Sequence, residues 1–225
     1  DGWLSERILL PARSIVRLPD EMSYETAAAL GAAAITAWTV LHNLGNLKSG
    51  DVVLTLGTGG VSIMALQIAK MNGARVVITS SSDEKLELAR NLGADVTINY
   101  RSNPDWDRIA RERTGGADIV VETVGPATLN QSIRACATNG RIGLLGALGG
   151  RTEQPLTAGP LLLGNVTVKG ITSASRRDLA DLLRAAVANG LEPHIDRRFE
   201  FDDALAAYAW LDEARHVSKV LVVQN

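Results

Sequence analysis

The sequence predicts an α/β fold in which helices cover both faces of a doubly wound, six-stranded parallel sheet. From residue 22 onward, short apolar runs alternate with amphipathic segments, which is the pattern of strands joined by helical crossovers. The apolar runs are continuous, as expected for parallel strands buried on both faces. A glycine-rich turn follows the first of them. Together these observations favour a sheet that binds a ligand at its carboxyl edge.

Six apolar runs are expected to form the strands of this sheet, at residues 52–56, 76–78, 96–98, 119–121, 142–145 and 166–171. Helices are expected between them, because serines stand at several helix starts and glycines follow several helix ends. Their predicted ranges are about 23–44, 61–72, 83–92, 103–114, 127–137 and 177–189.

The two ends of the chain depart from this rhythm. Residues 4–10 and 14–18 resemble short strands, and the tail predicts a strand at 199–201, a helix at 204–214 and a strand at 219–223. Isolated strands are marginally stable in water, so both ends are expected to belong to a second, incomplete domain. The predicted organisation is therefore 1–21, 22–196 and 197–225, with the chain a fragment of a longer protein.

Composition narrows the class of protein. The net charge of −2 gives no broad attraction to nucleic acid or anionic membranes, and no apolar run reaches the roughly 18 residues of a membrane span. The single cysteine, Cys136, cannot form an internal disulfide and is expected to pack on a helix. Because no basic and apolar leader opens the sequence, a cytoplasmic location is expected.

The glycine turn comprises Gly57, Thr58, Gly59, Gly60 and Val61, between the first predicted strand and a helix. Glycines at this place let backbone N–H groups approach a pyrophosphate closely. Ser62 stands where the dinucleotide-binding fingerprint has its third glycine, a position that governs packing and tolerates a small residue. The alternative is a turn made only for tight packing. No Gly-Lys-Ser/Thr follows, which excludes a P-loop.

The end of the second predicted strand bears on the choice between NAD and NADP. A site for NAD carries a carboxylate here, whereas this sequence has Ser80, Ser81 and Ser82 with no acid before Asp83. Hydroxyl groups can donate to a 2′-phosphate, and Lys85 can supply positive charge. NADP(H) is therefore the predicted cofactor. In the alternative interpretation, the serines form only a turn and a helix cap.

Seven motifs in this order resemble the medium-chain dehydrogenase/reductase superfamily, in its zinc-type alcohol dehydrogenase and quinone oxidoreductase branch. The resemblance covers essentially the whole chain, and it suggests a Rossmann-type fold. Its motifs are AAITAW (33–38), KSGD (48–51), GTGGVS (57–62), SSDEKL (81–86), LGAD (92–95), INY (98–100) and SKV (218–220).

The resemblance implies roles for particular residues around a bound dinucleotide. Ser80, Ser81, Lys85 and Tyr100 would surround the 2′-phosphate, and Thr123 and Val124 would lie near the nicotinamide ribose. The residues that would flank the nicotinamide are Gly146, Ala147, Leu148, Thr172 and Ser173. Thr36 would lie at the floor of the cleft, unless its hydroxyl only bonds to its own helix. Lys219 would either reach the cofactor or lie on a surface strand.

Two departures from the family pattern stand out. From the resemblance we expect this chain to lack most of the family's N-terminal GroES-like domain before Asp1, and residues 1–21 and 197–225 resemble the parts of that domain which lie in this chain. Zinc-using members carry a cysteine ligand where this sequence has Ala32. Because catalytic zinc needs three protein ligands, a zinc-free site is predicted. His42, His194 and His216 lack ligand spacing.

The expected activity is NADPH-dependent hydride transfer to or from a small-molecule carbonyl, enone or quinone. An alternative from another class is a truncated cofactor-binding module that binds NADP(H) without turnover. A methyltransferase is disfavoured by the hydroxyl-rich end of the second strand and by the sixth strand. Relatives commonly pair through the edge of this sheet, so a homodimer is expected.

Overall fold

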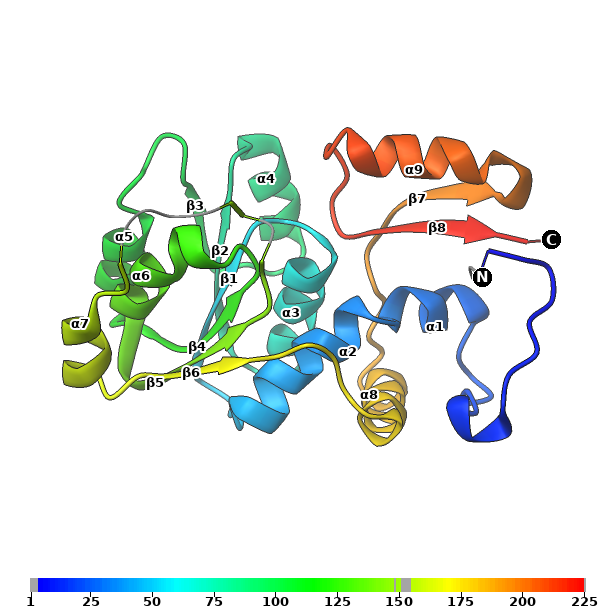
Figure 1. Cartoon of the computed structure of the whole chain (residues 1–225), viewed down its shortest axis with the longest axis horizontal. Helices are drawn as coiled ribbons and strands as arrows, with labels where there is room; N and C mark the ends of the chain where they lie inside the picture. Colours follow the sequence, from blue (N-terminus) through cyan, green and yellow to red (C-terminus); the bar gives the residue numbers. More distant parts are fainter. Residues whose placement is uncertain (1–3, 148, 151–154, 225) are drawn as a thin grey trace.

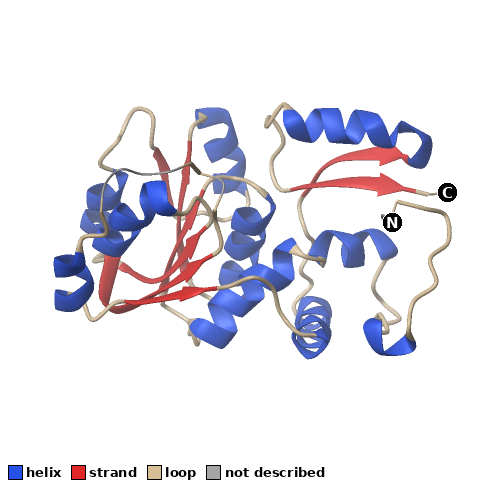
Figure 2. Cartoon of the chain, in the orientation of Figure 1, coloured by secondary structure: helices blue, strands red, loops and turns tan. Residues whose placement is uncertain are grey.

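The computed structural model describes residues 4–147, 149–150 and 155–224, and contains a six-stranded parallel sheet with helices on both faces (Figures 1 and 2). Its strands follow the order β3-β2-β1-β4-β5-β6. They are β1 (Val52–Leu56), β2 (Arg75–Ser80), β3 (Val96–Asn99), β4 (Ala117–Glu122), β5 (Cys136–Leu144) and β6 (Thr167–Gly170). This confirms the predicted fold class and the approximate position of each strand. The order reverses between β1 and β4, where sheets of this kind bind ligands.

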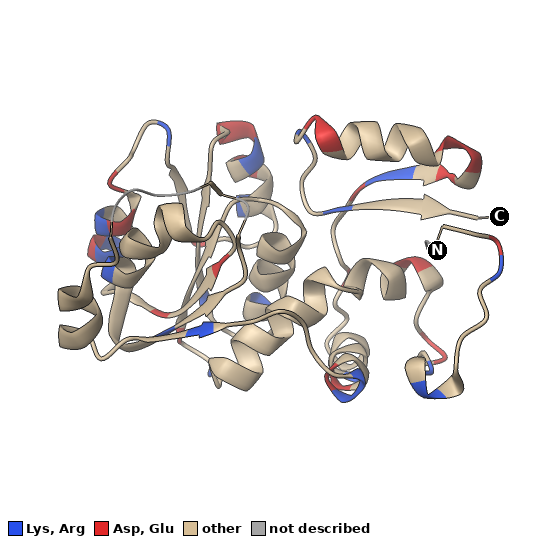
Figure 3. Ribbon diagram, viewed as in Figure 1, with Lys and Arg blue, Asp and Glu red and all other residues tan. Residues whose placement is uncertain are grey.

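Two apolar layers cover the sheet, because successive residues of a strand point to opposite faces. On one face, Val53 packs with residues of α3 (Gly60–Met71), α4 (Asp83–Asn91) and α8 (Arg176–Ala188). On the other face, Leu54 packs with residues of α5 (Trp106–Thr114) and α6 (Pro126–Ala135). Acidic and basic residues are interspersed along the chain (Figure 3).

The long helix expected before β1 is broken. It comprises α1 (Tyr24–Leu30), α2 (Ala33–Trp38) and a π-helical turn η2 (Thr39–Leu44). The break occurs at Ala32, whose φ of 40° lies outside helical values. No single helix among the described residues is long and apolar enough to cross a membrane. The two helical segments on either side of this break, taken together, are long and apolar enough by length and composition alone, but they are bent by 50°.

Two boundaries differ from prediction near α5 and α6. Helix α5 begins at Trp106 rather than at 103, because the backbone and side-chain amides of Asn103 both donate to Asn99 O and form a turn. Helix α6 ends at Ala135, so Cys136 is the first residue of β5 and not helical; it pairs in register with Ala117. A short helix, α7 (Ala158–Leu163), was not predicted.

The N-terminal expectation of two strands is wrong within the described residues. Residues 4–18 form no strand, only the 3₁₀ turn η1 (Ala12–Ser14), and Leu9 is 99% exposed. The apolar runs pair with no other strand in the described chain, so the backbone bonding that a strand requires is missing.

The C-terminal segment forms a second, two-stranded parallel sheet of β7 (Ile195–Glu200) and β8 (Lys219–Val223). The 3₁₀ turn η3 (Phe201–Asp203) and helix α9 (Ala204–Asp212) connect the two strands. Strand β7 is longer than the expected 199–201. Helix α9 ends earlier than 214, where Ala214 has a φ of 53°.

Candidate functional site

The glycine turn between β1 and α3 leaves open space in front of its backbone. Gly57 has a φ of 76°, a conformation that favours glycine, whereas Gly59 has φ −76° and ψ −176°. A Cβ atom added at either residue would meet no other atom within 4 Å. The first N–H groups of α3, which begins at Gly60, have no acceptor within their own helix. The turn therefore presents backbone donors to an unfilled space.

Ser62, at the third position of the fingerprint, is buried and lies in the first turn of α3. Its hydroxyl donates to the carbonyl oxygen of Leu56 at 2.6 Å. This bond satisfies the hydroxyl and ties the helix to the end of β1. The serine therefore serves the close helix–strand packing that glycine provides in the usual fingerprint.

The start of β8 lies against the same turn. The backbone N–H of Ser218 donates to Thr58 O at 3.0 Å, and the buried Ser218 hydroxyl has no hydrogen-bond partner within the described chain. The Cδ atom of Lys219 would be 3.3 Å from a Cβ at Gly60. Burial lowers the pKa of Lys219. The structure thus brings a hydroxyl group and a lysine from residues near the C-terminus to the glycine turn.

Of these two residues, sequence reasoning identified Lys219 as one that could reach the cofactor and missed Ser218. The SKV motif (218–220) includes Ser218 but assigns it no role, because its position beside Thr58 depends on a contact between residues 160 positions apart.

Ser80, the last residue of β2, and the two serines that follow it lie beside the end of β3. The buried Ser80 hydroxyl accepts a long bond of 3.5 Å from the N–H of Ser82, and the Ser82 hydroxyl caps α4 through Lys85 N. The exposed Tyr100 donates its backbone N–H to Ser80 O at 3.0 Å. Ser81 lies between them in sequence and is half-buried. The predicted 2′-phosphate residues Ser80, Ser81 and Tyr100 are therefore neighbours, and Ser82 also forms the cap of the alternative interpretation.

The Lys85 side chain is engaged elsewhere. Its Nζ donates to the carbonyl oxygens of Ala214 at 2.6 Å and of His216 at 3.1 Å. Next to this loop of residues 214–216, the carboxylate of Asp196 accepts the backbone N–H of Val217 at 2.8 Å. Burial lowers the pKa of Lys85, and the nearby Asp196 carboxylate opposes that shift. In this structure Lys85 stabilises the 214–216 loop by these two hydrogen bonds. Its role at a 2′-phosphate stays a prediction.

The residues expected near the nicotinamide follow the ends of β4, β5 and β6. The Thr123 hydroxyl donates to Leu56 O at 2.7 Å, and Val124 O accepts the N–H of Gly149 at 3.0 Å. The further residues of this group are Gly146, which is half-buried, and Ala147, Thr172 and Ser173, which are exposed. Leu148 lies outside the described residues. These loops and the glycine turn share the carboxyl edge of the sheet.

Thr36 and Ala32 lie on the broken early helix. The Thr36 hydroxyl donates to Ala32 O at 2.7 Å, the helix bond of the alternative interpretation. Ala32 offers no donor atom for a metal. Among the residues that the structure describes, no three His, Cys, Asp or Glu side chains cluster as metal ligands. The absence of zinc from the whole protein stays a prediction.

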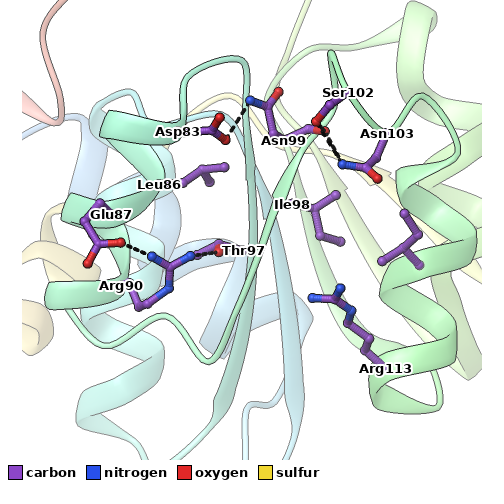
Figure 4. Close-up of a pocket in the computed structure, with 11 residues that line it drawn as sticks. Asp83, Leu86, Glu87, Arg90, Thr97, Ile98, Asn99, Ser102, Asn103 and Arg113 are labelled. Carbon is purple, nitrogen blue, oxygen red and sulfur yellow. Dashed lines mark hydrogen bonds and ion pairs between the residues drawn. The ribbon is translucent and has the colours of Figure 1, made fainter.

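A pocket of about 330 Å³ lies along the edge strand β3, between α4 and α5 (Figure 4). At one end the Asn99 amide donates to Asp83 at 2.8 Å, and further along Arg90 binds both Glu87 and Thr97. The glycine turn contributes no residue to its lining. This pocket is therefore separate from the predicted pyrophosphate site.

We compared the chain with known protein families, sequences and solved structures. The zinc-binding dehydrogenase family matches residues 60–188. The chain is 39% identical over 229 residues to the zinc-type alcohol dehydrogenase-like protein C1773.06c of Schizosaccharomyces pombe, covering 99% of this chain and 66% of that protein.

Two solved structures are similar throughout most of the chain. An NAD-dependent alcohol dehydrogenase has 34% identity and a TM-score of 0.86, over 99% of this chain and 65% of that one. The mycobacterial protein Rv1454c, complexed with NADPH, has 28% identity and a TM-score of 0.80, over 95% and 69% of the two chains. The chain spans 65–66% of the length of three curated relatives that it matches.

Proposed function

Since the chain belongs to the zinc-binding dehydrogenase family, within the medium-chain dehydrogenase/reductase superfamily, we propose that it is the dinucleotide-binding part of an NADP(H)-dependent oxidoreductase. The observation that carries this proposal is the open glycine turn at the start of α3, with Lys219 beside it.

The glycine turn suits a pyrophosphate for three reasons. Gly57 and Gly59 have no side chains to fill the space in front of the backbone. The N-terminal end of α3 carries partial positive charge and free N–H groups, which favour an anion. Lys219 adds a cation, and the unpartnered Ser218 hydroxyl adds a donor. Gly57–Val61, Ser218 and Lys219 would therefore hold the diphosphate.

The preference for NADP(H) over NAD(H) is supported by the hydroxyl groups that follow β2. Ser80 occupies the last position of the strand, where a carboxylate would bind the ribose of NAD, and Ser81 follows it. Ser81 is next to Ser80 in sequence and Tyr100 donates its backbone N–H to Ser80 O, so both would meet a 2′-phosphate bound at the strand end. Lys85 would join them by giving up its bonds to the 214–216 loop.

In the proposed reaction the bound nicotinamide supplies or accepts the hydride. The residues of this chain orient the cofactor: the turns that carry Thr123, Val124, Gly146 and Ala147 would enclose the nicotinamide and its ribose. The proposed substrate is a carbonyl, enone or quinone. Because Ala32 cannot coordinate a metal, we propose that the reaction proceeds without catalytic zinc; stoichiometric zinc in the purified full-length protein would contradict this.

The second candidate is a module that binds NADP(H) without turnover. It is favoured by the share of relatives that the chain spans, which leaves a third of their length unmatched. We also propose a homodimer formed through β6, a strand at the edge of the sheet, next to the exposed Leu162 and Leu163 of α7. The cytoplasmic location remains a prediction from sequence.

A fluorescence titration with NADPH, NADH and S-adenosylmethionine tests the proposal. We expect the chain to bind NADPH more tightly than NADH and not to bind S-adenosylmethionine. NADH binding at least as tight as NADPH binding would refute the cofactor preference. Failure to bind either nicotinamide dinucleotide would refute the function itself.

A further inference from the structure

Glu122, the last residue of β4, is fully buried, and its acidic side chain forms no ion pair with the residues that the structure describes. Its carboxylate is held by hydrogen bonds. One oxygen, Oε1, accepts from the backbone N–H of Val124 at 2.9 Å, the N–H of Gly125 at 3.0 Å and the hydroxyl of Thr128 at 2.9 Å. The other, Oε2, accepts from the Ser132 hydroxyl. The carboxylate therefore fixes the turn that follows β4 and anchors it to α6.

The main chain of Glu122 holds a second loop. Its carbonyl oxygen accepts the N–H of Leu145 at 2.9 Å and the N–H of Gly146 at 3.1 Å. One residue thus binds the turn after β4 with its side chain and the loop after β5 with its backbone. Both segments lie where the nicotinamide end of the dinucleotide is expected.

The two segments also contact each other directly. A Cβ atom at Gly125 would lie 2.4 Å from Gly146 O, and one at Gly146 would lie 2.3 Å from the Thr123 backbone. Contacts this close leave no room for a side chain at either glycine. A displacement of the turn after β4 must therefore displace the loop after β5.

We infer that Glu122 is a positioning residue for the nicotinamide half of the cofactor, an inference that rests on the proposed function. It touches no cofactor atom itself. It holds the backbone of Val124 and of Gly146 at the separation that the nicotinamide and its ribose require. The glycine turn and the serines after β2 make no contact with this carboxylate, so the adenosine half binds independently of it.

The substitution Glu122→Gln tests this inference because it preserves size but replaces one acceptor oxygen by an amide that donates. An amide nitrogen in place of Oε1 would face the N–H groups of Val124 and Gly125, which cannot accept a hydrogen bond. In place of Oε2 it would face the Ser132 hydroxyl, which would have to turn to accept from it. Either orientation also removes the negative charge that strengthens these bonds. We expect NADPH to bind at least tenfold more weakly, and 2′,5′-ADP, which lacks the nicotinamide half, to bind within twofold of the unmodified chain. The fluorescence anisotropy of bound NADPH should also fall. Glu112→Gln, an exposed carboxylate on α5, is the matched control.

Each outcome decides something. Equal losses for NADPH and 2′,5′-ADP, or no loss for either, would overturn the role of Glu122 while leaving the proposed function intact. If the unmodified chain binds neither ligand, the proposed function fails and this inference fails with it. If Glu122→Gln does not fold, Thr128→Val removes a single donor: at least threefold weaker NADPH binding with unchanged 2′,5′-ADP binding would support the inference, and unchanged NADPH binding would overturn it.

Discussion

The substitution Gly59→Ala separates cofactor binding from folding at the glycine turn. The backbone angles of Gly59, φ −76° and ψ −176°, are accessible to alanine, and its added methyl would meet no atom within 4 Å. The smaller backbone entropy of the unfolded variant stabilises the fold by about 0.4–1 kcal/mol, and alanine at the N-cap of α3 costs a similar amount. We therefore expect the free energy of unfolding to change by less than about 0.5 kcal/mol.

The same methyl group would occupy the space where a pyrophosphate oxygen should approach the backbone. Losing one charge-assisted hydrogen bond costs about 1.5–3 kcal/mol. That loss corresponds to NADPH binding roughly 10- to 150-fold more weakly.

The assay is a pair of measurements on each variant, urea unfolding and NADPH titration. Gly159→Ala is the matched control, because a Cβ there also meets nothing within 4 Å and its site in α7 is remote from the turn. We expect this control to bind NADPH as the unmodified chain does. If Gly59→Ala keeps its stability and also binds NADPH within twofold of the unmodified chain, the pyrophosphate does not lie over this turn.

Three further predictions concern single side chains. Lys85→Ala should weaken NADPH more than NADH, and should also lower the melting temperature because the 214–216 loop loses its tether; an equal loss for the two dinucleotides would remove Lys85 from the 2′-phosphate. Burial lowers the pKa of Lys219, so its charge is lost at a lower pH than that of an ordinary lysine. NADPH affinity should therefore fall in alkaline buffer, and Lys219→Arg should reduce that fall; identical pH profiles would contradict the role of this cation. Burial raises the pKa of Cys136 from 9.0 to about 12, so its thiolate at pH 8 should be about a thousandfold scarcer and the folded chain should resist an aromatic disulfide reagent until urea unfolds it.

The central strands were predictable because burial on both faces requires continuous apolar runs, and β1 matches its predicted range of 52–56. The local pattern of apolar residues gave wrong predictions where a segment becomes a strand only if another strand lies beside it. Residues 4–18 look like strands but have no strand beside them, whereas Cys136 leaves the helical pattern because it pairs with Ala117. The break at Ala32 was not predicted, although Gly31, the C-cap of α1, directly precedes it. The alanines around it favour helix and led to the expectation of one continuous element.

In the candidate site, too, residues defined by local sequence were predicted, whereas residues brought together by long-range contacts were not. The glycine turn and Ser80 were identified because their spacing along the chain is local. Ser218 and the loop contacts of Lys85 depend on approaches between distant segments, which single-sequence spacing does not contain. Glu122 was missed for a different reason: a lone acidic residue at the end of an apolar run gives no indication that four donors converge on it.

The two-stranded sheet of β7 and β8 contacts the six-stranded part of the molecule at the glycine turn. Its strand β8 starts at Lys219, and the preceding Ser218 forms a parallel bridge with Gly59. A rotation of the small sheet would therefore move the Lys219 ammonium group and the Ser218 hydroxyl group away from the glycine turn together. If a dinucleotide binds at this turn as proposed, its release should be coupled to that rotation, and the two rates should rise and fall in step.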